Sequence, residues 1–123
     1  MEIEAVAKIV VDAILKVHRT FGPGLLESAY RQCLIRELIL RGLKVAFEVV
    51  LPIVYEGAEI GTGYRIDMLV EDCIIVENKA VTELLPIHHM QLLTYMRLSK
   101  CKIGFLVNWN VRLIKEGINR KII

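Results

Sequence analysis

The spacing of apolar residues changes from a helical to a strand period at Gly42, and this change restricts the chain to mixed α/β folds. Before Gly42, residues 3–19 and about 25–41 carry apolar side chains every three or four positions, as amphipathic helices do. A Gly-Pro-Gly break at 22–24 separates the two segments. After Gly42, residues 45–51 alternate apolar side chains in the manner of a strand. We therefore expect two helices followed by a sheet.

The second half of the chain predicts a crossover unit. Residues 73–80 and 102–109 are expected strands, and residues 86–98 are an expected helix between them. Strands joined by a connection of this kind lie parallel in one sheet. Residues 63–70 form a further expected strand, and the tail 111–123 is expected to add one or two short strands.

Length and composition fit one domain spanning residues 1–123. Hydrophobic residues make up 54% of the chain, which is enough for a core, but no apolar run approaches the roughly 20 residues of a membrane span. The N-terminus carries acids where a signal peptide carries positive charge, so we expect a cytoplasmic protein. The three widely spaced cysteines predict buried or half-buried thiols.

Charged residues interrupt two of the expected strands. Asp67 lies within 63–70, and Glu77-Asn78-Lys79 follows an apolar run. Such charges are expensive to bury unless they pair or bind a metal. Glu77 and Lys79 are two apart and share a face of the sheet. Asp67 and Glu77 on adjacent strands can share a Mg²⁺ ion, while Lys79 can orient or deprotonate a water, or offset transition-state charge.

This site requires a particular loop between the two strands. A two-residue turn at Glu71-Asp72 places Asp67 opposite Val76 and leaves Glu77 on the other face. A loop with an odd number of residues, such as Glu71-Asp72-Cys73, or a bulge, brings Asp67 and Glu77 to one face. We predict one of these two arrangements.

Two polar residues on the expected helices are further candidates. Glu27, in the first turn of its helix, is either a site acid or a carboxylate that interacts with the helix dipole. Gln91 shares a helix stripe with His88 and Tyr95, and either faces Lys79 or is exposed. The opposite side of this helix is expected to pack, through Ile87, Met90, Leu93 and Leu98.

The segment GLLESAY at 24–30 matches the GxxExxY signature, and the chain resembles the protein family named after it. The resemblance continues through Tyr64-Arg65-Ile66-Asp67, through Val76-Glu77-Asn78-Lys79-Ala80 and through residues 86–95, so it covers nearly the whole chain. This family looks like a branch of the PD-(D/E)xK nuclease superfamily. The resemblance therefore implies a restriction-endonuclease-like αβββαβ core, with a mixed sheet and flanking helices.

The resemblance also implies a site. By position it consists of Glu27, Asp67, Glu77, Lys79 and Gln91. Asp67, Glu77 and the main-chain carbonyl of Asn78 are the implied metal ligands, with Mg²⁺ or Mn²⁺ as the cofactor. Tyr30, Tyr64 and Arg65 either contact nucleic acid near this site or serve packing and surface pairing.

The implied function is metal-dependent hydrolysis of phosphodiester bonds in DNA or RNA. The competing hypothesis is a catalytically silent module that binds nucleic acid or protein, because a fold alone does not prove an activity. Retention of every polar residue of the pattern favours the enzyme. A domain this small has few surfaces for recognition, so a homodimer or a partner protein is also expected.

Overall fold

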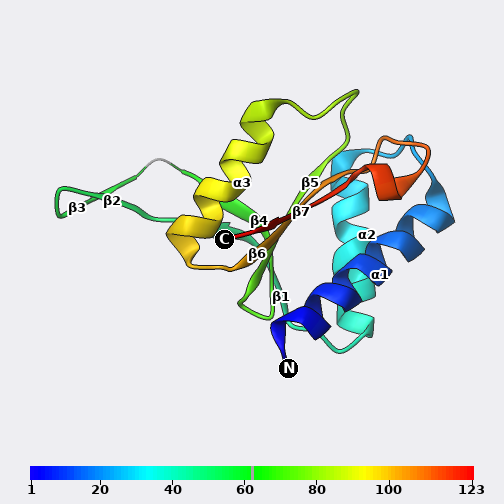
Figure 1. Ribbon diagram of the computed structural model, residues 1–123, viewed down its shortest axis with the longest axis horizontal. Helices are drawn as coiled ribbons and strands as arrows, with labels where there is room; N and C mark the ends of the chain where they lie inside the picture. The colour runs from blue at the N-terminus through cyan, green and yellow to red at the C-terminus, as the bar shows by residue number, and fades with distance from the viewer. Residues whose placement is uncertain (62) are drawn as a thin grey trace.

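Helices cover both faces of a five-stranded mixed sheet in the computed structural model, which describes residues 1–61 and 63–123 (Figure 1). The sheet has the strand order β1-β4-β5-β6-β7. Along the chain the elements are α1 (Ile3–Phe21), α2 (Glu27–Leu40), β1 (Val45–Val50), β2 (Ile53–Tyr55), β3 (Ala58–Ile60), β4 (Arg65–Val70), β5 (Ile74–Lys79), α3 (Pro86–Ser99), β6 (Ile103–Asn108), the 3₁₀ turn η1 (Ile114–Glu116) and β7 (Ile118–Ile122). The succession α2-β1-β4-β5-α3-β6 is the expected αβββαβ core, and β5 and β6 are parallel as predicted.

The helices α1 and α2 pack on one face of the sheet, and α3 packs on the other (Figure 1). The apolar stripe of α1 is buried, as its spacing predicts. Its buried members include Val6, Val10, Ala13, Ile14 and Val17. They join a core whose sheet residues include Met68, Val70, Ile74, Val76, Phe105 and Val107. No helix in the described part of the chain combines the length and apolar character that a membrane crossing needs.

The loop between β4 and β5 has three residues. Val70 pairs with Ile74, so Glu71, Asp72 and Cys73 lie outside the ladder, and the predicted odd-numbered loop is confirmed. Glu71 and Asp72 have φ angles of 51° and 56°, the left-handed conformation that suits the twist of a hairpin. The antiparallel register, continued beyond the last regular pair, brings Asp67 beside Glu77.

The predicted packing stripe of α3 is wrong at three of its four residues, and only Leu93 is half-buried against the core. Ile87, Met90 and Leu98 are 56%, 57% and 45% exposed, whereas Leu92 and Met96 are fully buried. The helix approaches the sheet at Gly104, where an added Cβ would lie 2.7 Å from Met96 Sδ. Apolar side chains occur on nearly every side of this helix, so their spacing does not select the buried face.

A small hairpin of β2 and β3 extends away from the main sheet (Figure 1). The sequence pattern predicts no strand here, and the chain turns at Glu56–Gly57, with φ angles of 49° and 77°. Strands of three residues are too short to show an alternating period. The expected strand from residue 63 begins at Arg65. The burial predicted for the thiols is confirmed, since Cys101 is buried and Cys33 and Cys73 are half-buried.

We expect Gly117→Ala to destabilise the protein by about 2–3 kcal/mol, because overpacking next to an immovable atom costs energies of this order. A Cβ at Gly117 would lie 2.2 Å from the main-chain oxygen of Asn108, at the end of β6. Urea unfolding measures this loss. The matched control is Gly61→Ala, where an added Cβ meets nothing within 4 Å. Equal stability of the two variants would contradict this account of the β6 end.

Candidate active site

All five candidate residues line one cavity of about 380 Å³. Glu27 comes from the start of α2, Asp67 from β4, Glu77 and Lys79 from β5, and Gln91 from α3. The remaining lining residues are Glu48, Arg65, Ile66, Asn78 and Tyr95. The contacts of α2 and α3 with β5 therefore bring together side chains that lie up to 64 positions apart in the sequence.

The sheet opens where the two strand carboxylates lie. Regular pairing of β4 with β5 ends at Met68 and Val76, although both strands continue past this pair. Beyond it, side chains replace the ladder. The Asp67 amide donates to Glu77 Oε2 at 2.8 Å, and the Asn78 amide donates to Asp67 Oδ2 at 3.0 Å. Each carboxylate thus satisfies a main-chain donor of the neighbouring strand, and the opening is stable without backbone pairing.

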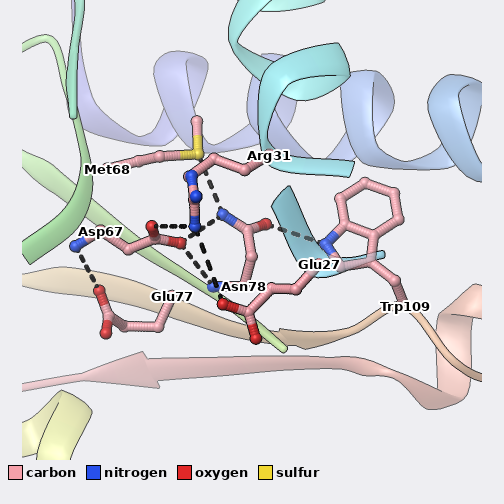
Figure 2. A network of polar contacts seen from close by, with 7 residues as sticks. All are labelled: Glu27, Arg31, Asp67, Met68, Glu77, Asn78 and Trp109. Carbon is pink, nitrogen blue, oxygen red and sulfur yellow. Dashed lines mark hydrogen bonds and ion pairs between the residues drawn. The ribbon is translucent and has the colours of Figure 1, made fainter. Parts of the chain in front are cut away.

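The Asp67 carboxylate is held on both of its oxygens (Figure 2). Oδ2 accepts from the Asn78 amide and also from Asn78 Nδ2, at 2.7 Å. Oδ1 accepts from Arg31 Nη1 at 3.0 Å. The side chain is 15% exposed, so these three donors replace most of the water that it would bind in the unfolded chain.

Asn78 is a positioning residue that sequence reasoning assigned only a main-chain role. Its side chain is buried, and Oδ1 accepts from Trp109 Nε1 at 2.9 Å. Nδ2 is thereby turned toward Asp67 and also lies 3.1 Å from Met68 Sδ. The sequence did not predict this side-chain role, because the contact with Trp109 spans 31 positions and has no signal in the spacing.

The tyrosine of the GxxExxY signature, Tyr30, packs against the residues that position Asp67. Tyr30 is fully buried, and its ring stacks on Trp109 with a centroid distance of 4.8 Å. Its hydroxyl donates to the Gly22 carbonyl and accepts from the Leu25 amide. Tyr30 therefore serves packing, which decides between the two roles that the sequence left open. It ties the loop before α2 to the Trp109–Asn78–Asp67 chain of contacts.

Arg31 is the residue that sequence reasoning missed. Its Nη1 lies 3.0 Å from Asp67 Oδ1 and 3.7 Å from Glu27 Oε2. Figure 2 shows the guanidinium between these two carboxylates. The spacing of Glu27 and Arg31, four positions apart on a helix, signals an ion pair. The contact with Asp67 spans 36 positions and has no signal in the sequence.

Burial raises the pKa of the Glu77 carboxyl from 4.5 to about 7. The hydrogen bond from the Asp67 amide lowers this pKa, the charge of Asp67 raises it, and Lys79 and Glu27 contribute in opposite senses. Desolvation therefore outweighs the partners that favour the charged form. Perturbed carboxyls of this kind concentrate at functional sites.

Lys79 and Gln91 line the cavity, and of the two alternatives left open for Gln91 the structure shows the exposed one. Lys79 is half-buried and Gln91 is exposed. Within residues 1–61 and 63–123, no hydrogen bond joins the two side chains. Tyr64 and Arg65 are both exposed at this side of the molecule, and Arg65 lines the cavity.

The acids line one cavity without converging on a single point. In the part of the chain that the structure describes, no three His, Cys, Asp or Glu side chains come close enough together to hold an ion. Asp67 is turned toward Arg31 and Asn78, while Glu77 Oε2 accepts from the Asp67 amide. What the arrangement provides is two carboxylates from adjacent strands, a third on α2, and a lysine beside them.

Replacing Glu77 should show the cost of its burial in the metal-free protein. The folded state binds the Glu77 proton more tightly than the unfolded chain does, so wild-type stability falls as the pH rises from about 4.5 to about 7. We expect Glu77→Gln to unfold like the wild type near pH 4 and to be more stable by up to about 3 kcal/mol above pH 7. Chemical unfolding in a chelator, at a series of pH values, measures this difference.

The control for that series is Glu59→Gln, which alters an exposed carboxyl on β3. Its stability relative to the wild type should not change across the same pH range. A Glu77→Gln effect that is independent of pH would contradict the raised pKa of Glu77.

The comparison with known families agrees with this architecture. The family model described as the PD-(D/E)XK nuclease superfamily matches residues 4–121, nearly the whole chain. No curated protein and no solved structure gave a match. Nucleases of this superfamily generally use divalent metal ions, and their restriction-endonuclease-like fold is a mixed sheet flanked by helices, as found here. The chain belongs to the PD-(D/E)XK nuclease superfamily.

Proposed function

We propose that this protein is a nuclease of the GxxExxY branch that uses Mg²⁺ or Mn²⁺ to hydrolyse phosphodiester bonds of DNA or RNA in the cytoplasm. The observation that supports this most strongly is the shared cavity, in a chain of a nuclease superfamily, of Glu27, Asp67, Glu77, Lys79 and Gln91. Superfamily membership supports a nucleic-acid substrate, and the chemistry of the cavity supports hydrolysis.

The donor set suits a hard divalent cation. Four carboxylates and two basic side chains line the cavity, and Arg31 pairs with two of these acids from beside it. The formal charge of the group is still negative, so it repels phosphate unless a cation is added. Mg²⁺ commonly takes only one or two protein carboxylates and keeps several waters. Asp67 and Glu77, with the main-chain carbonyl of Asn78, would hold the ion. When bound, it supplies positive charge that polarises a phosphate oxygen and lowers the pKa of a water.

The protein's own groups then have distinct roles. Lys79 orients the attacking water, takes its proton, or offsets the charge that develops on the phosphate. Its position two residues from Glu77 on β5 keeps it on the same face of the strand. Glu27 adds a third carboxylate at the cavity wall. Gln91 on α3 orients the substrate, or turns to orient Lys79, with which it makes no hydrogen bond in the metal-free fold described here.

The second candidate is a silent module that binds nucleic acid or a protein. Exposed apolar side chains on the β2–β3 hairpin and on α3 favour contact with another chain, whether a second copy or a partner protein. They include Val54, Tyr55 and Ile60 on the hairpin and Ile87, Met90 and Leu98 on α3. These exposed side chains are compatible with either function, whereas buried acids at a strand opening have no evident role in a silent module. We therefore favour the enzyme.

Lys79→Ala should reduce cleavage by at least about 100-fold, the usual effect of losing a positioned proton-transfer or charge-stabilising group. The assay incubates purified protein with single- and double-stranded DNA and RNA in Mg²⁺ or Mn²⁺, and measures products over time. The matched control is Lys8→Ala, which removes an exposed lysine of α1 and should cleave like the wild type.

Two results would count against the nuclease. Undiminished cleavage by Lys79→Ala would remove the role assigned to the lysine. Wild-type protein that binds these substrates but cleaves none of them with either metal would support the silent module.

A further inference from the structure

One nitrogen of Arg31 occupies the position between two acids that a bound cation would be expected to share. Nη1 is 3.0 Å from Asp67 Oδ1 and 3.7 Å from Glu27 Oε2, and the dashed lines in Figure 2 join it to both. The arginine and Asp67 side chains are only 17% and 15% exposed. Water therefore screens the ion pair of Arg31 with Asp67 less than it screens a surface ion pair.

The guanidinium is poorly satisfied in this position. Arg31 Nε is buried and has no hydrogen-bond partner among the described residues. An arginine placed only for stability would be expected to use its planar fork in a bidentate pair. Here a single nitrogen, Nη1, lies near both Asp67 and Glu27, and the buried Nε has no hydrogen-bond partner among the described residues.

We propose that Arg31 is an internal counter-cation that competes with the divalent metal for Asp67. It neutralises the two acids in the metal-free protein and weakens metal binding, so that it sets the affinity of the site. This inference rests on the proposed function, because it takes Asp67 as a metal ligand.

The competition follows from charge. Asp67 Oδ1 accepts from Arg31, while both hydrogen bonds to Oδ2 come from Asn78. A divalent ion that approaches Asp67 therefore finds both carboxylate oxygens already hydrogen-bonded. The Arg31 guanidinium occupies Oδ1, and the main-chain and side-chain amides of Asn78 occupy Oδ2. A positive charge about 3–4 Å away opposes a second cation strongly in a half-buried site. Removing the arginine charge removes this opposition but leaves Asp67 and Glu27 without their partner.

Arg31→Met tests the inference by metal binding and stability, without relying on catalysis. We expect the variant to bind Mn²⁺ about tenfold more tightly or better in calorimetry, because the opposing charge is gone. In chelator, the variant should also melt at a lower temperature than the wild type. When Mn²⁺ is added, its melting temperature should rise by more than that of the wild type. A purely structural arginine would lower the melting temperature without tightening Mn²⁺ binding.

Arg41→Met is the matched control. Arg41 follows the last residue of α2 and pairs with Glu37 at 2.8 Å, so the variant loses a comparable ion pair outside the cavity. Its Mn²⁺ affinity should equal that of the wild type. Arg31→Gln serves where methionine prevents folding, because glutamine keeps a hydrogen-bond donor for Asp67 but not the charge. It should also bind Mn²⁺ more tightly.

The outcomes separate the two proposals. If the wild type binds Mn²⁺ and neither Arg31 variant binds it more tightly, the competition is refuted while the metal site stands. If the wild type binds no Mn²⁺ but an Arg31 variant does, the competition is supported in its strongest form. If none of the proteins binds Mn²⁺, both the metal site and the inference fail.

Discussion

The exchange of hydrogen bonds between Asp67 and the β5 strand is the contact on which the site depends. At this point two carboxylates replace the main-chain carbonyls as hydrogen-bond acceptors. The Asp67 amide donates to Glu77, and the Asn78 amide donates to Asp67. An ordinary sheet would close here and leave no room for a substrate. The side-chain bonds keep the strands apart while satisfying their main-chain donors, so one feature both shapes the cavity and places its acids.

Two charged groups of the site are in environments that cost stability, and the surrounding packing holds them there. Glu77 is desolvated enough that its pKa rises to about 7, and Arg31 leaves a buried Nε without a partner among the described residues. Asn78, Trp109 and the stacked ring of Tyr30 form a rigid backing on the other side of β5. Local instability supported by a rigid shell is typical of sites where binding or catalysis, rather than stability, has determined the residues.

Much of this architecture could be predicted from local patterns. The change of period at Gly42 identified the order of the main helices and strands. The need to place Asp67 and Glu77 on one face required an odd-numbered loop or a bulge, and the structure has the odd-numbered loop, which ends before Ile74. The failures share a cause, which is that they depend on tertiary contacts. Leu92 and Met96 are buried because Gly104 admits them, and Arg31 meets Asp67 across 36 positions. No spacing rule carries that information.

A crystal structure of the wild type soaked in Mn²⁺, with anomalous scattering used to locate the metal, tests the central claim most directly. If Asp67 and Glu77 hold the metal, one strong anomalous peak appears in the opening between β4 and β5, within bonding distance of carboxylate oxygens from both residues. Manganese bound only elsewhere, with those two carboxylates still bonded as they are in the metal-free fold, would contradict that claim.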